Sequence, residues 1–175
     1  MVSTPHATLD NECLNTYRSG VARNLRDELK QTRPWACLQE EVSLNIARTS
    51  AVLDHEMAQM LKPYGITSTQ YNVLRILRGA GEGGLCRNEV GERLIRSVPD
   101  VTRLLDRMEQ QRLIDRRRVG DDRRFVTTYI TAEGLELLGK LDDLVLAFHR
   151  DRLAHLDSDQ LKALIELLES VRSVR

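Results

Sequence analysis

Apolar residues recur every three or four positions along most of this chain, which is the spacing of one face of an α-helix. Clusters of glycine and proline interrupt the pattern and separate its segments. The pattern predicts helices over residues 10–32, 35–62, 67–78 and 87–94, and further helices beginning at about Val98, Thr131 and Asp157. A mainly α protein is therefore expected.

The helix predicted from Val98 has a short start signal and one apolar side. Ser97 and Asp100 stand at the spacing of a capping box, and Pro99 is tolerated because a first-turn N–H has no intrahelical acceptor to lose. The apolar stripe of this helix comprises Val98, Val101, Leu104, Leu105 and Met108.

Thr102, Arg103 and Arg107 fall outside this stripe and form a polar side. Such a side is either solvated or a binding surface, and the segment that follows favours binding. Residues 113–119 and 125–130 are rich in Val, Thr, Tyr and Phe, which suit strands. Because the turn between them is highly charged, it is expected to project into solvent or onto a polyanion. The order is that of a reading helix followed by a wing.

Positive charge is concentrated in this region. Residues 93–124 contain ten arginines and six acidic residues, a net charge of +4, whereas the whole chain has a net charge of zero. The planar guanidinium of arginine matches phosphate oxygens and guanine edges better than a lysine ammonium does. A nucleic-acid partner is therefore expected.

Two motifs in this region resemble those of MarR-type winged helix-turn-helix transcription regulators. The wing motif consists of Asp122-x-Arg124 followed by Ile130-Thr131, with isoleucine in place of the usual leucine. Residues 100–114, DVTRLLDRMEQQRLI, look like the recognition helix of that family running into its wing. The resemblance extends over roughly residues 38–172 and implies a mainly α fold with a small β-wing.

The resemblance implies a role in DNA recognition for several side chains. Arg124 would reach the minor groove from the wing, with Asp122 holding the geometry of the tip. The residues expected to face the major groove are Ser97, Thr102, Arg103 and Arg107, and the other candidate contacts are Arg117 and Arg123. Because residues 116–118 alternate across a strand, only some of their arginines are expected to touch DNA at once.

The expected organisation has three parts. Residues 1–34 form an N-terminal extension with one helix, residues 66–131 form the winged helix-turn-helix domain, and residues 35–62 and 134–175 supply helices for dimerisation. The resemblance implies a two-fold homodimer that binds a near-palindromic operator in double-stranded DNA. The alternative is that these helices only complete the core of a monomer.

Two kinds of signal are weighed. Some members of this family sense peroxide through a cysteine near the first helices, so Cys13 and Cys37 are candidate redox residues, with inert thiols as the alternative. A small aromatic ligand is the other option. The residues considered for its pocket are Trp35, Met57, Met60 and Tyr64, which are also typical of a helical core.

Other protein classes receive no support from the residues. No apolar run approaches 18 residues and no leader is recognisable, so neither a membrane span nor secretion is expected. The expected location is cytoplasmic. Phosphate-loop, nucleophile-elbow and metal-ligand motifs are missing, so no enzyme, cofactor or metal is expected. The sequence predicts a DNA-binding regulator, most often a repressor in this family. The alternative is a winged-helix dimer that acts through protein contacts or non-specific DNA binding.

Overall fold

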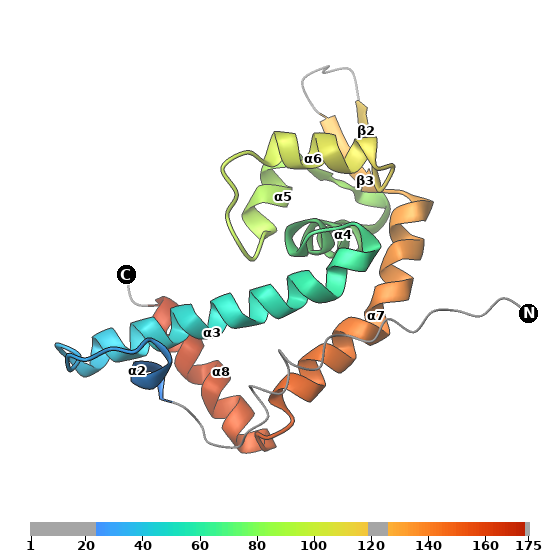
Figure 1. Cartoon of the computed structure of the whole chain (residues 1–175). Helices are drawn as coiled ribbons and strands as arrows, with labels where there is room; N and C mark the ends of the chain where they lie inside the picture. The colour runs from blue at the N-terminus through green and yellow to red at the C-terminus, as the bar shows by residue number, and fades with distance from the viewer. Residues whose placement is uncertain (1–23, 119–125, 174–175) are drawn as a thin grey trace, which may run out of the picture. The chain divides into compact units, whose positions relative to one another are not determined.

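A computed structural model describes residues 24–118 and 126–173 of the chain (Figure 1). The helices are α2 (Leu25–Glu28), α3 (Leu38–Leu61), α4 (Ser68–Ala80), α5 (Arg87–Arg93), α6 (Val101–Gln110), α7 (Ala132–Leu153) and α8 (Ser158–Ser173). Two short 3-10 helices are η1 (Lys62–Tyr64) and η2 (Gly81–Gly83), and the strands are β1 (Leu85–Cys86), β2 (Ile114–Arg118) and β3 (Val126–Ile130). The mainly α fold with a small β-wing is confirmed.

The chain divides into two compact units, Met1–Leu53 and Asp54–Arg175. In the first unit, α2 is capped by Asn24, whose Oδ1 accepts from the Asp27 N–H at 3.0 Å. The helix predicted to run to residue 32 ends instead at Glu28. The backbone of Lys30 turns into the left-handed region, with φ +50°, which no α-helix can include. The predicted part over residues 10–23 lies outside the described residues.

Helix α3 begins three residues later than its apolar pattern predicts. Just before the helix, the Ala36 N–H donates at 2.7 Å to Oε2 of Glu40, a carboxylate of its first turn. At its other end, α3 passes into η1, and Gly65 then adopts φ +71°. The predicted stop at the proline and glycine of residues 63–65 is confirmed.

The core of the second unit lies under the sheet and between α4, α5, α6 and α7. Its least exposed large side chains are Leu61, Leu74, Leu77, Leu105, Met108, Ile114, Leu138 and Leu141. Helix α4 starts at a capping box in which the Gln70 N–H donates to Oγ1 of Thr67 at 3.2 Å and the Thr67 N–H donates to Oε1 of Gln70 at 2.9 Å. This predicted box is confirmed.

The small sheet has three antiparallel strands in the order β1-β3-β2. Its wing hairpin pairs Ile114 with Ile130 and Arg118 with Val126, close to the predicted strand limits as far as the described residues extend. Strand β1 was not predicted. It has only two residues, too few to show alternation, and it pairs with Thr127 and Thr128 far along the chain.

Helices α7 and α8 begin where the sequence predicts. Oγ1 of Thr131 accepts from the Gly134 N–H at 3.1 Å at the start of α7. Before α8, Oδ1 of Asp157 accepts from the Gln160 N–H at 2.9 Å, and Oε1 of Gln160 accepts from the Asp157 N–H at 3.0 Å. Within residues 24–118 and 126–173, none of the helices is long and apolar enough to cross a membrane.

Candidate nucleic-acid interface

Helices α5 and α6 lie side by side, joined by the turn segment of residues 94–100, and the β2–β3 hairpin lies beside α6 (Figure 1). The two helices approach closely because α5 carries a glycine at the contact. A β-carbon on Gly91 would lie 3.3 Å from Cγ2 of Val101. From α4, Oδ1 of Asn72 accepts the Ile95 N–H of the turn at 3.0 Å. The turn and the start of α6 are thereby fixed on α4 and α5.

The start of α6 differs from the sequence prediction. The helix begins at Val101, and Asp100 is its N-cap, with Oδ1 accepting from the Arg103 N–H at 2.8 Å. Ser97 therefore lies outside the helix and is exposed, and the predicted capping box and start at Val98 are wrong. Pro99 disfavours helical backbone at Val98, and the cap at Asp100 sets the start at Val101.

The two sides of α6 are as predicted. Leu104, Leu105 and Met108 are buried in the core at 6%, 1% and 0% exposure. Thr102, Arg103 and Arg107 lie on the exposed side. Because three apolar side chains anchor the helix, its polar side is presented on a rigid element.

The exposed arginines of α6 have no acidic partner among the described residues. No carboxylate of residues 24–118 or 126–173 lies within ion-pair distance of the guanidinium of Arg103 or Arg107. The Arg107 Nε donates only a long 3.4 Å bond to the carbonyl of Arg103. Two neighbouring guanidinium groups without a carboxylate partner create a positive surface that attracts an anion.

Arg116 of β2 is bound to α6 instead. Its Nη2 lies 2.6 Å from Oδ1 of Asp106 and 2.5 Å from Oε2 of Glu109, and its Nε donates to the same Glu109 oxygen at 3.0 Å. The hydrogen bond to Glu109 is the main reason that the pKa of Arg116 is raised above its ordinary value. This contact fixes β2 against α6.

Strand alternation places Arg117 on the other face of the sheet from Arg116. There its Nε lies 2.6 Å from Oδ2 of Asp115, and its Cζ lies 5.5 Å from the centre of the Tyr129 ring. Arg117 is exposed but already paired. The other wing residues singled out from the sequence, Asp122, Arg123 and Arg124, lie outside the described residues.

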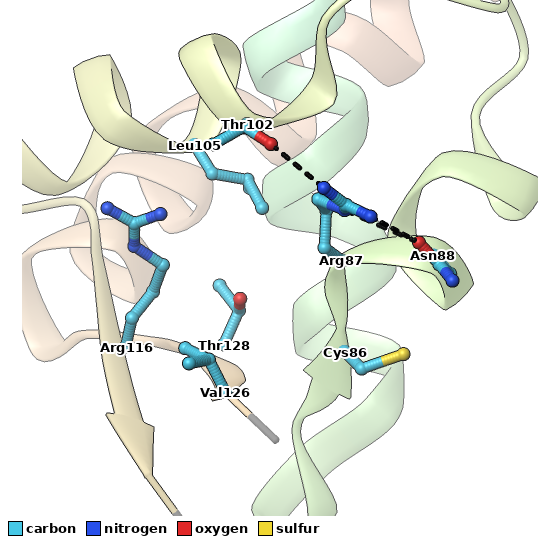
Figure 2. Close-up of a pocket in the computed structure, with 8 residues that line it drawn as sticks. All are labelled: Cys86, Arg87, Asn88, Thr102, Leu105, Arg116, Val126 and Thr128. Carbon is cyan, nitrogen blue, oxygen red and sulfur yellow. Dashed lines mark hydrogen bonds between the residues drawn. The ribbon is translucent and has the colours of Figure 1, made fainter. Parts of the chain in front are cut away.

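A hollow of about 420 Å³ opens between the start of α5, α6 and the wing (Figure 2). It is lined by Cys86, Arg87, Asn88, Thr102, Leu105, Arg116, Val126 and Thr128. Arg87 and Arg116 stand on opposite sides of it, and the Cys86 sulfur points away from Thr128 (Figure 2). Arg87 and Asn88 also line a second hollow of about 350 Å³, which extends to Ser97.

Sequence analysis did not single out Arg87 or Asn88. Both stand at the start of α5, where Oε2 of Glu89 accepts the Cys86 N–H at 2.7 Å. That hydrogen bond is the main reason that the pKa of Glu89 is lowered. The spacing of an N-cap and an acidic third residue was the signal available in the sequence, since it marks where a helix and its exposed first turn begin.

The residues proposed for signal sensing are distributed between the two units. Met57, Met60 and Tyr64 are partly buried and pack against the core of the second unit. Trp35 lies in the first unit, and its Nε1 is buried with no hydrogen-bond partner among the described residues.

The remaining side chains to consider are the cysteine thiols and those that could bind a metal ion. Cys37 is an exposed free thiol, and Cys13 lies outside the described residues. Within residues 24–118 and 126–173, no group of three His, Cys, Asp or Glu side chains could hold a metal ion.

A helix, a turn, a second helix with an exposed arginine side and a β-hairpin beside it define a winged helix-turn-helix protein. A model of the MarR family matches residues 64–124. The transcriptional regulator TtmR of Methylorubrum extorquens is 27% identical, covering 98% of this chain and 84% of that protein. A crystal structure of a MarR transcription factor from Planctomyces limnophilus is 34% identical, with a TM-score of 0.60 over 78% of this chain and 98% of that one.

This chain belongs to the MarR family of transcriptional regulators. The structure of S. aureus MepR in complex with DNA has the same fold, with 22% identity and a TM-score of 0.69 over 75% of this chain and 97% of that one. The relatives are transcription regulators, so the expectation that the chain is not an enzyme is confirmed.

Proposed function

We propose that this chain is a sequence-specific DNA-binding repressor that binds a near-palindromic operator as a homodimer. The observation that carries the proposal is the exposed side of α6, where Arg103 and Arg107 have no acidic partner among the described residues. MepR, which shares the fold, forms a complex with DNA. In helix-turn-helix proteins the second helix enters the major groove, and here that helix is α6.

The proposed contacts divide into three groups. Ser97, Thr102, Arg103 and Arg107 face the major groove, where arginine reads a guanine edge or holds a phosphate. On the wing, Arg124 enters the minor groove with Asp122 and Arg123 at the tip. Arg117, paired to Asp115 on the other sheet face, has a weaker claim to a DNA contact than the residues of α6.

The proposed domain organisation follows the sequence analysis, with residues 66–131 as the DNA-binding domain and residues 35–62 and 134–175 as dimerisation helices. Support for the dimer comes from α8, a helix of 16 residues in which none is buried. Its exposed apolar side chains are Leu164, Ile165, Leu167 and Val171. A second copy of the chain would cover this apolar surface.

A signal is proposed to release the repressor from DNA. The candidates are a small aromatic ligand at Met57, Met60 and Tyr64 of the second unit, or oxidation of Cys13 or Cys37. Either signal works only if it binds or stabilises the DNA-incompetent state of the dimer better than the competent one. Addition of each class of compound to the DNA complex therefore has a defined readout, the change in affinity for the operator.

The test begins with selection of bound duplexes from a random DNA library, using the full chain at moderate salt. The expected product is a two-fold-symmetric motif with half-sites about one helical turn apart. Arg103→Ala and Arg107→Ala should each weaken binding and lower the magnitude of the slope of log affinity against log salt by up to about 0.9. Arg33→Ala, an exposed arginine outside the proposed DNA-binding and dimerisation segments, is the control and should leave the slope unchanged.

One alternative remains as an outcome of this test. A winged-helix dimer that acts through protein contacts, or that binds DNA without sequence preference, would yield no motif. Recovery of no motif, with weak binding that disappears as salt rises, would reject the proposal of a sequence-specific regulator.

A further inference from the structure

Arg87, the first residue of α5, is held by two neutral side chains (Figure 2). Its Nη1 donates to Oγ1 of Thr102 on α6 at 3.3 Å. Its Nε and Nη2 donate to Oδ1 of Asn88 at 3.3 and 3.2 Å. These contacts link the starts of the two helices of the helix-turn-helix unit through one guanidinium group.

The charge of Arg87 is not neutralised within the described part of the chain. Both of its partners are uncharged, and no carboxylate of residues 24–118 or 126–173 lies within ion-pair distance. A guanidinium has five N–H groups, and the contacts to Asn88 and Thr102 use three of them. Two N–H groups therefore remain able to donate to an anion.

Arg116, on the opposite side of the same hollow, provides the contrast. It faces Asp106 and Glu109, and two carboxylates satisfy both its charge and its donors. A fold that used Arg87 only as a structural link would gain more from a carboxylate at the position of Asn88 or Thr102. Neutral partners orient the guanidinium while leaving its charge available.

We infer that Arg87 is a further DNA-contacting residue, which donates to a phosphate oxygen, and that Asn88 and Thr102 are positioning residues that hold its guanidinium. The inference rests on the proposed function. A phosphate is the expected partner because the first helix of a helix-turn-helix unit crosses the DNA backbone, and Arg87 begins that helix. Thr102 then contributes to affinity through Arg87 as well as through its place on α6.

Arg87→Ala and Arg87→Lys test the phosphate contact on the full chain with the selected duplex. Arg87→Ala should weaken binding about tenfold at moderate salt and reduce the magnitude of the salt slope by about 0.9. Arg87→Lys should restore the slope but only part of the affinity, because an ammonium keeps the charge and loses the planar fork. An unchanged affinity and slope for Arg87→Ala would overturn the inference.

A double-mutant cycle tests the role of Thr102. Thr102→Val keeps the shape of the side chain and removes the hydroxyl, and it should weaken binding about threefold in the native background and by a clearly smaller factor in the Arg87→Ala background, where only its own place on α6 still counts. The same factor in both backgrounds would mean that Thr102 acts independently of Arg87 and would overturn its positioning role. A merely structural loss would appear as a lower melting temperature, which is measured for every variant.

The failure of this inference is distinguishable from that of the proposed function. If the native chain selects a motif and Arg103→Ala weakens binding while Arg87→Ala does not, the inference about Arg87 fails and the proposed function stands. If the native chain selects no motif, the proposed function fails, and the inference fails with it.

Discussion

Arg78 on α4 and Asp142 on α7 form an ion pair with two contacts, Nη1 to Oδ2 at 2.7 Å and Nη2 to Oδ1 at 2.9 Å. The hydrogen bond from Arg78 is the main reason that the pKa of Asp142 is lowered, and the same contact raises the pKa of Arg78. The pair joins the helix beneath the helix-turn-helix unit to the helix that follows the wing.

The first prediction concerns the pH dependence of this pair. Because the pKa of Asp142 is lower in the folded protein than its ordinary value of 3.8, its stabilisation is fully present above that value and is lost as the pH falls through the folded pKa. Asp142→Asn should lower the free energy of unfolding by about 0.5–1 kcal/mol at neutral pH, since both side chains are partly exposed. Urea unfolding across acidic pH should show this difference vanish. Asp143→Asn is the control, and an equal pH-dependent loss there would contradict the prediction.

The second prediction concerns Gly134 at the start of α7. A β-carbon there would lie 2.4 Å from the Leu113 carbonyl oxygen, which belongs to the backbone and cannot move aside easily. Gly134→Ala should therefore destabilise the fold by about 1–3 kcal/mol. Gly139, on the same helix, has nothing within 4 Å of such a β-carbon.

Gly139→Ala is the matched control, and it should stabilise α7 by about 0.5–1 kcal/mol through helix propensity. Thermal or urea unfolding of the two variants measures the difference directly. Opposite signs are expected, with the larger change for Gly134→Ala, and stabilisation by both substitutions would show that the contact at Leu113 relaxes without cost.

Local patterns were predictable from the sequence, and distant pairings were not. The buried stripe of α6 followed from apolar spacing within one helix, and the capping box at Thr67 and Gln70 followed from residues three apart. Strand β1 could not be predicted, because a two-residue strand has no period and its partner Thr128 is distant in the chain. Features set within one short segment could therefore be predicted from the sequence, and contacts between two distant segments could not.

The candidate interface shows the same division. The alternation of Arg116 and Arg117 across β2 was expected, but the sequence could not say which of them faces α6. That choice depends on the packing of the strand, and it places Arg116 against Asp106 while Arg117 meets Asp115. A count of arginines therefore overestimates the number available to DNA.

The third prediction tests the corrected start of α6. Asp100 caps the helix through the Arg103 N–H, so Asp100→Ala should lower the free energy of unfolding by about 0.5–2 kcal/mol. Ser97, exposed and outside the helix, should tolerate Ser97→Ala within about 0.5 kcal/mol. Urea unfolding of both variants decides between the two starts. A larger loss for Ser97→Ala would favour a helix that begins at Val98.

The fourth prediction concerns the contact that fixes the wing on α6. Arg116 is 23% exposed and bound to two carboxylates, so Arg116→Gln should destabilise the protein by about 1 kcal/mol. Arg118, exposed at the end of the same strand, has no acidic partner among the described residues. Arg118→Gln should change stability by less than about 0.5 kcal/mol. Equal effects in chemical unfolding would mean that the charge of the strand matters and the contact does not.

The last prediction concerns the apolar side of α8. Leu167 is 66% exposed, and the helix buries none of its residues, so its apolar side lacks a cover within the described part of the chain. If a second copy covers it, Leu167→Glu places a charge in the interface and should shift the particle toward the mass of a single 20.0 kDa chain in sedimentation equilibrium. Lys162→Glu adds the same side chain on the polar side, beside Asp159, and should leave the mass of the assembly unchanged.

Because both substitutions introduce an exposed glutamate on one helix, a general electrostatic effect would lower the mass of both assemblies, whereas loss of an apolar interface would lower only that of Leu167→Glu. A native chain that already sediments as a single chain would show that α8 is not a dimer contact, and the operator would then need no two-fold symmetry.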